Sequence, residues 1–175
     1  MNESAFNVAV YVRDYLLEVF KACGRPLGRS LIAVGGITVD NADSGLLVVA
    51  PSRVFPATTP FPTEMQMTGL QYADLIGVEF IVQIHQCVPV LTETGAVPSA
   101  EVQEAAHRVL LDDSAVLWRA LWSDELLGDE WERSNVDMTF PEPLGGYGAV
   151  EARFSLGLTQ YDWCLPCNGA DEGEV

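Results

Sequence analysis

The chain has 175 residues, of which 49% are hydrophobic and 19% are charged, and its formal net charge is −16 at pH 7. This length favours a single domain with a full hydrophobic core, and the apolar content argues against intrinsic disorder. Such an excess of carboxylates disfavours tight binding to a phosphate backbone, which needs clustered Lys and Arg. No apolar run reaches the roughly 18 residues that a membrane span needs. Glu3 stands where a secretory signal would carry basic residues, so we expect a cytoplasmic protein.

The charge is unevenly distributed along the chain. Residues 1–30 carry four basic and three acidic side chains, a net charge of +1, whereas residues 112–142 carry nine acidic side chains against Arg119 and Arg133, a net charge of −7. Residues 163–175 add an acidic tail. This pattern is compatible with simple solubility, with a surface that meets a basic partner, and with a pore wall that repels DNA so that it can pass.

The first predicted elements are a helix and several short strands. Residues 4–23 place apolar side chains at three- and four-residue spacing, and a Gly and a Pro follow, as at a helix end. Short apolar runs at residues 31–34, 37–39 and 46–50 predict strands, the first two separated by a Gly-Gly pair that indicates a bend or a hairpin.

Residues 55–73 are predicted to form a long loop, because three prolines interrupt a stretch with little periodicity. Several of its side chains are nevertheless apolar, and a long loop in a compact domain is usually functional or mobile. These side chains either pack on the subunit's own sheet or bind a partner. The candidate interface residues in this loop are Phe55, Phe61, Met65, Met67 and Tyr72.

A long alternating strand beginning at Ile76 and a second one at residues 150–161 enclose a long helix at residues 99–122. Ser99 is a good N-cap for this helix, and Asp112-Asp113-Ser114 either caps a second helix or kinks the first. A short strand is expected around Met138. We expect one core that contains Val78, Phe80, Val82, Phe154 and Leu156 of the strands with Leu16, Phe20, Val109 and Leu110 of the helices. The opposite face of the strands carries Glu79, Gln83, Glu151 and Arg153, of which Glu79, Glu151 and Arg153 are further candidate interface residues.

This order of elements predicts an α+β fold: residues 1–175 form a single domain with an antiparallel or mixed sheet and helices packed on one face. No catalytic, cofactor or metal site is predicted. The segment Trp163–Cys167 has the spacing of a redox motif, but the Gly-rich acidic tail after it leaves no helix to lower a thiol pKa. His85 and Cys87, with Cys164 and Cys167, have the ligand types of a zinc site, yet His85 and Cys87 fit a strand pattern, so we expect reduced, metal-free cysteines.

Two segments together resemble a known family. They are VEFIVQIHQCVPVLTETGAVPSAEVQEAAHRVLLDDSAVLWRAL, at residues 78–121, and PLGGYGAVEARFSLGL, at residues 143–158. Both resemble head-to-tail connector proteins of actinobacterial long-tailed phages, especially the tail terminators: a strand ends near Cys-Val-Pro, a Gly/Pro turn leads to an Ala-rich helix, and a Gly-Gly segment opens a final strand. The resemblance covers about half of the chain, mainly residues 76–160.

The resemblance implies a structural protein of the virion, assembled in the host cytoplasm. Tail terminators are α/β proteins that form a hexameric ring on the tail tube, stop its polymerisation and join it to the head connector while genome DNA passes through the lumen. The implied partners are further copies of this chain, the major tail tube protein and a head-to-tail stopper or connector protein; no enzyme activity or cofactor is implied. Two alternatives stay open: another connector component (a stopper or an adaptor), and a small cytosolic enzyme with an unrecognised site.

Overall fold

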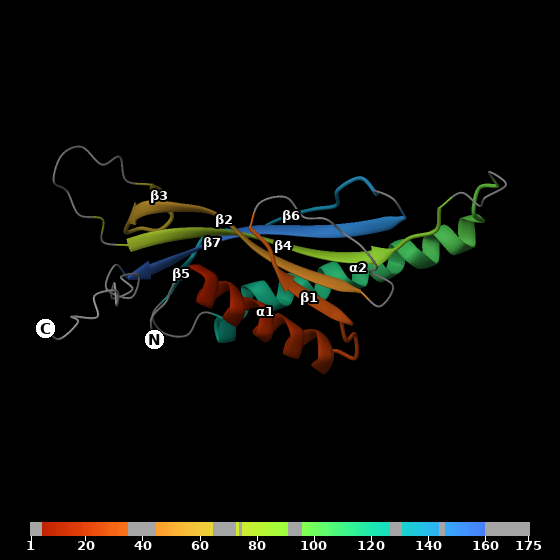
Figure 1. The fold of residues 1–175 in the computed structure, drawn as a ribbon, viewed down its shortest axis with the longest axis horizontal. Helices are drawn as coiled ribbons and strands as arrows, with labels where there is room; N and C mark the ends of the chain where they lie inside the picture. Colours follow the sequence, from red (N-terminus) through yellow and green to blue (C-terminus); the bar gives the residue numbers. More distant parts are fainter. Residues whose placement is uncertain are drawn as a thin grey trace, which may run out of the picture.

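The computed structural model of the chain describes residues 5–34, 45–64, 73, 75–90, 96–126, 131–143 and 146–159. These residues form two α-helices, one short 3-10 helix and a sheet of seven strands (Figure 1). The helices are α1 (Ala5–Ala22), α2 (Ala100–Trp122) and η1 (Asp124–Leu126). The strands are β1 (Arg29–Ile32), β2 (Leu46–Thr58), β3 (Thr63–Glu64), β4 (Leu75–Cys87), β5 (Glu132–Arg133), β6 (Asp137–Thr139) and β7 (Tyr147–Thr159).

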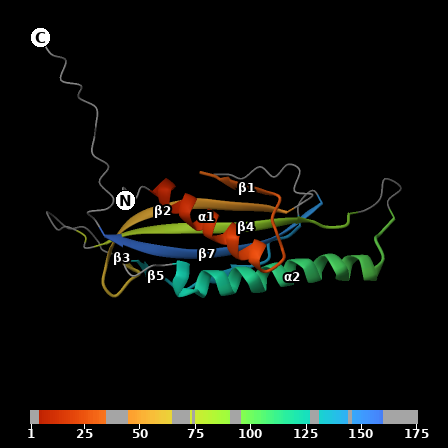
Figure 2. The same ribbon diagram turned by 90° about the horizontal axis from the view of Figure 1, so that it is seen from below.

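The sheet is mixed, with the strand order β1-β2-β4-β7-β5. Strands β1 and β2 are parallel, and the other pairs are antiparallel, including β3 with β2 and β6 with β7. Three strands of 13 residues each, β2, β4 and β7, make up its centre. Both helices lie on the same face of the sheet (Figures 1 and 2). The predicted α+β fold in a single compact domain is therefore confirmed.

The helix-covered face of the sheet holds the main core, and strict alternation in β4 and β7 builds it. Alternate residues point to one side of a strand, and on this side the rings of Phe80 and Phe154 stack with centroids 5.7 Å apart. The strand residues of the core are Leu47, Val49, Val78, Phe80, Val82, Ile84, Val150, Ala152, Phe154, Leu156 and Leu158. The face assignment made from the sequence is correct for both long strands.

Helix α1 packs its predicted apolar stripe on this core. Its buried residues are Val8, Ala9, Val12, Leu16 and Phe20. Phe6, at the first turn, instead has 57% of its surface exposed. Leu16 and Phe20 therefore share the core with Phe80 and Phe154, as the sequence predicts.

Helix α2 is one continuous helix, so the alternative in which Asp112–Ser114 caps a second helix is wrong. The N-cap prediction is confirmed, because the Ser99 hydroxyl accepts a hydrogen bond from the Val102 amide. Only the C-terminal half of α2 has the sheet beneath it; the N-terminal half extends past the ends of the strands (Figures 1 and 2). Val109 was predicted to be a core residue, and this is wrong, because Val109 is 38% exposed, whereas the neighbouring Leu110 is buried. Val102, one heptad before Val109, is exposed as well.

The predicted loop at residues 55–73 needs correction at its start. Strand β2 continues to Thr58, and β3 pairs with its end, Thr58 with Thr63. Proline is tolerated in β2 because Pro51 adjoins a bulge, where Ser52 has no partner in the register with β4. Strand β7 begins at Tyr147, three residues earlier than predicted, and the two-residue strands β3 and β5 were not predicted. The predicted run 37–39 and the acidic tail 163–175 lie outside the described residues.

Candidate assembly surfaces

The face of the sheet opposite the helices, which we call the outer face, carries a hydrogen-bonded polar network at its centre. Gln83 Nε2 donates to Glu151 Oε2 at 2.6 Å, and Arg153 Nε donates to Glu151 Oε1 at 2.7 Å. Because the Gln83 amide nitrogen is used in this way, its oxygen is the acceptor for His85 Nε2, 3.0 Å away. Hydrogen bonds thus connect four side chains of the central strands β4 and β7 in the order His85, Gln83, Glu151 and Arg153.

The network holds Glu151 ionised and His85 neutral. Burial alone would raise the pKa of Glu151, but the hydrogen bonds from Gln83 and Arg153, together with the nearby charges of Arg153 and His85, lower it below its ordinary value. Burial lowers the pKa of His85, and the attraction of Glu151 only partly offsets this effect. The hydrogen bond and charge of Glu151 raise the pKa of Arg153. Such a carboxylate is a fixed negative charge rather than a proton donor at neutral pH.

One end of the outer face is covered by two aromatic rings. A side chain at Gly77 would meet the ring of Phe55, with a Cβ only 2.4 Å from it, and one at Gly157 would come within 2.9 Å of Phe61. The glycines therefore provide the space in which these rings lie on the sheet, with their centroids 6.3 Å apart. Phe55 is 7% exposed, so Phe55 and Phe61 follow the alternative in which loop side chains pack on the subunit's own sheet.

The remaining candidate interface residues separate into two groups. Glu79, Glu151 and Arg153 lie together on the outer face, where Glu79 accepts a hydrogen bond from the Ser52 hydroxyl at 2.9 Å and Arg153 keeps 56% of its side chain exposed. Both oxygens of Glu151 are used within the chain, so Arg153 offers the most free hydrogen-bonding capacity of the three. Met65, Met67 and Tyr72 lie outside the described residues.

The unsupported half of α2, Ala100–Val109, is the second surface. Val97, just before the helix, is 72% exposed, Val102 is 51% exposed and Val109 is 38% exposed. Beside them a cavity of about 550 Å³ lies between residues 88–90, Gln103 and His107 of α2, and the start of β7. The walls of this cavity are largely apolar, and the described residues that line it include no carboxylate. This end of the molecule thus combines exposed valines with a concave apolar surface.

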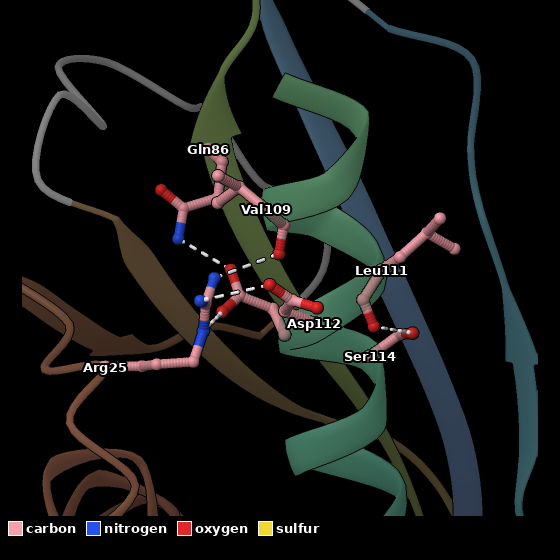
Figure 3. Close-up of polar contacts among 7 residues, drawn as sticks. Arg25, Gln86, Val109, Leu111, Asp112 and Ser114 are labelled. Atoms are coloured by element: carbon pink, nitrogen blue, oxygen red, sulfur yellow. Dashed lines mark hydrogen bonds and ion pairs between the residues drawn. The ribbon is translucent and has the colours of Figure 1, made fainter. Parts of the chain in front are cut away.

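A buried ion pair fixes α2 at the point where it leaves the sheet. Asp113 is 1% exposed, and its Oδ1 accepts from Arg25 Nε at 2.6 Å while its Oδ2 accepts from Gln86 Nε2 at 2.7 Å. Arg25 also donates to the Val109 carbonyl at 3.0 Å and approaches Asp112 at 3.6 Å. Figure 3 shows Arg25 and Gln86 converging on this turn of α2. We call Arg25, Gln86 and Asp113 the α2 clamp.

The α2 clamp connects three elements that are distant in sequence: the segment after α1, the end of β4 and the middle of α2. A buried carboxylate without such partners would be strongly unfavourable. Sequence reasoning missed this cluster and considered Asp113 only as part of a cap or kink. The available signal was periodicity, because Asp113 lies three residues after Leu110 and four before Leu117, inside the apolar stripe.

Within the described residues, no group of three or more His, Cys, Asp and Glu side chains is arranged to hold a metal ion. His85 is part of the outer-face network, and the side chains of Cys23 and Cys87 are exposed; Cys164 and Cys167 lie outside the described residues. Neither α1 nor α2 contains a stretch apolar and long enough for a membrane span, in the part of the chain that the structure describes.

Comparison with known proteins gives no family: no protein-family model matches this chain, and no curated protein sequence matches it. The function has to be inferred from the surfaces described above and from the resemblance of residues 76–160.

Proposed function

We propose that the protein is a structural subunit of a phage neck, a tail terminator that assembles into a ring on the tail tube. The observation that carries this proposal is the unsupported half of α2. A helix that continues its core stripe past the end of its own sheet exposes apolar side chains that a neighbouring subunit can bury.

The two candidate surfaces suit a ring because one is polar, the outer face of the sheet, and the other is apolar, the unsupported half of α2, and they lie on different parts of the subunit. A closed ring uses a heterologous contact, in which two different surfaces of each subunit meet. The unsupported half of α2 lies at one end of the molecule, and the outer face of the sheet has no helix of the described chain on it (Figures 1 and 2). In this proposal Val97, Val102 and Val109 of one subunit pack on the next subunit in the ring.

The charge supports a role in which DNA passes without being bound. The net charge of −16 gives a ring a strongly negative field, which repels phosphates and keeps a lumen clear. The polar residues of the outer face also support a structural role more than a catalytic one. A general acid needs a raised carboxylate pKa, whereas the pKa of Glu151 is lowered by hydrogen bonds inside the chain.

Negative-stain electron microscopy of the purified protein tests the proposal. We expect rings with a central hole, and we expect added protein to stop the growth of tail tubes made from the major tail tube protein. A protein that stays monomeric by sedimentation at high concentration and leaves tube growth unchanged would contradict the proposal. Rings that do not stop tube growth would favour a different layer of the connector.

A pair of variants locates the contact. Val102→Ser with Val109→Ser should weaken ring formation by at least about tenfold, because burying two valine side chains at an interface contributes on the order of 2–4 kcal/mol. Val34→Ser is the matched control, since Val34 is also exposed, at 82%, but follows β1 rather than lying on α2. An equal loss of rings in the control would show that the effect is not specific to α2.

A further inference from the structure

A stripe of exposed apolar side chains runs along α2 on the side turned away from the core. Leu111, Ala115, Trp118 and Trp122 follow at spacings of four, three and four residues, which puts them on one face of the helix. Leu111 is 58%, Trp118 is 44% and Trp122 is 39% exposed, and the two indole rings lie 5.6 Å apart. We call these four residues the tryptophan stripe. It is distinct from the exposed valines of the unsupported half.

Three of the nine basic side chains of the protein border the tryptophan stripe. Arg133 lies over the ring of Trp122, 4.6 Å from its centroid. Arg108 and Arg119 flank the stripe on one side, and neither forms an ion pair with the part of the chain that the structure describes. Asp112, on the same flank, approaches Arg25 instead. In a strongly acidic protein, this surface fits a peptide segment that carries apolar side chains followed by carboxylates.

The chain contains a segment of this chemistry at residues 160–175, which lie outside the described residues. Most of its apolar side chains come first, with Asp162 among them, and three further carboxylates follow; the segment contains no Lys or Arg. The apolar residues are Tyr161, Trp163, Leu165 and Pro166, and the acidic residues are Asp162, Asp171, Glu172 and Glu174.

The place where β7 ends brings this segment to the tryptophan stripe. Leu156 of β7 pairs with Arg133, the residue that covers Trp122, and β7 ends three residues later. Figure 2 shows the end of β7 and the C-terminal end of α2 at the same end of the molecule. Sixteen residues span up to about 50 Å when extended, whereas Trp122 and Arg108 are about 21 Å apart along the helix axis. The segment is therefore long enough to follow the whole stripe.

We propose that residues 160–175 dock on the tryptophan stripe of the same chain, antiparallel to α2. The apolar part of the segment contacts Trp118 and Trp122, near the end of β7, and its carboxylates lie beside Arg119 and Arg108. Glu104, one turn beyond Arg108, would repel the carboxylates and limits how far the segment extends. This contact goes beyond the proposed ring and does not depend on it.

Amide hydrogen exchange of the full chain tests this docking. We expect the amides of residues 161–175 to exchange on the order of tenfold more slowly in the natural protein than in Trp118→Ser with Trp122→Ser. Equal exchange in the two proteins would overturn the proposal. Both tryptophans are substantially exposed, so the variant should fold, and unchanged far-UV circular dichroism together with unchanged exchange in β4 and β7 verifies this.

A charge variant tests the arginines separately. Arg108→Gln with Arg119→Gln should reduce the protection of the segment by roughly three- to tenfold, and 0.5 M salt should reduce it similarly, because exposed charges interact weakly and are screened. Arg13→Gln with Lys21→Gln removes the same charge from α1 and should leave the protection unchanged. If both pairs act alike, overall charge and not the stripe attracts the segment, which overturns the proposed role of Arg108 and Arg119.

Protein concentration distinguishes docking within one chain from docking on a neighbour. Protection that is equal in dilute and concentrated protein supports contact within one chain. Protection that appears only as the concentration rises would show that the segment occupies another copy, which overturns the proposal as stated. Micrographs of the Trp118→Ser, Trp122→Ser variant keep the two proposals apart, because loss of docking should leave ring formation intact.

Discussion

The two halves of α2 have the same helical periodicity but different surroundings. In the C-terminal half, Leu117 and Leu121 are fully buried between α1 and the sheet. In the N-terminal half, Val102 and Val109 are 51% and 38% exposed, and the first turns of α2 extend past the ends of the strands (Figure 1). An amphipathic pattern shows which side of a helix is apolar; it does not show how far the partner surface extends.

The two faces of the sheet also differ in whether a helix covers them. The face under the helices is apolar and closely packed, with Phe80 and Phe154 at its centre. On the outer face, polar side chains satisfy one another through Gln83, His85 and Glu151. The surfaces on which no helix or strand of the described residues packs are the surfaces where we place contacts with other chains. The predictions below test this contrast.

The largest loss of stability is expected in the core between the sheet and the helices. Phe80→Ala should lower the free energy of unfolding by about 3–5 kcal/mol, because it leaves a cavity between the sheet and the helices. Urea denaturation measures this loss. Phe140→Ala is the control, since Phe140 is 53% exposed and its removal should cost less than about 0.5 kcal/mol. A loss under about 1 kcal/mol for Phe80→Ala would mean that the core has been placed on the wrong face.

A smaller but substantial effect is expected at the α2 clamp. Arg25→Met should lower the free energy of unfolding by about 2–4 kcal/mol, because it leaves the buried Asp113 carboxylate with Gln86 as its remaining side-chain partner. Arg13→Met provides the control, since the Arg13–Asp14 pair lies on the surface and should contribute under about 1 kcal/mol. Similar losses in the two variants would indicate that Asp113 does not depend on Arg25.

At the outer-face network, Glu151→Gln should lower the free energy of unfolding by about 1–2 kcal/mol at pH 7, because it weakens the hydrogen bonds of the carboxylate. The folded-state pKa of Glu151 is lowered, so this stabilisation is present above the unfolded pKa of about 4.3 and is lost as the pH falls through the folded pKa. The unfolding free energies of the natural protein and the variant should therefore converge in acid. A difference that stays constant down to the lowest pH at which the protein folds would exclude an ionised Glu151 as its source.

His85 should give a weaker pH dependence at higher pH. Because burial lowers its pKa in the folded state, the unfolded chain binds a proton first as the pH falls below about 6.5. Stability is then lost between this value and the folded pKa. Thermal melting between pH 7 and pH 5 should show a decrease that is smaller in His85→Gln. Parallel curves for the two proteins would place the titrating group elsewhere.

The smallest effect is expected on the unsupported half of α2. Val102→Ser with Val109→Ser should change the free energy of unfolding of the monomer by less than about 1 kcal/mol, because neither side chain is buried. Leu117→Ala on the same helix should cost about 2–5 kcal/mol. Comparable losses at both places would mean that the N-terminal half is covered within the subunit, and the proposed ring contact would lose its basis.

The sequence predicted most of the helix and strand boundaries because the relevant periodicities are local. The N-cap at Ser99 and the two faces of β4 and β7 follow from side chains within a few residues of one another. The extension of β2 to Thr58 was missed because its prolines outweighed a strand pattern that is stabilised by pairing with β4. Two-residue strands such as β5 carry too few residues for a pattern and exist only through their pairing with β7.

What the sequence determined by itself is the fold class and the side of each long element that is apolar, because both depend on spacing along the chain. The tertiary structure decided which apolar residues are covered: Leu117 is fully buried, whereas Val109 is 38% exposed. It also decided the partners of charged and aromatic groups, since Arg25 meets Asp113 and Phe61 lies over Gly157 across separations that no local pattern encodes. Those contacts depend on where the chain places each element in space, and so does the surface left for other subunits.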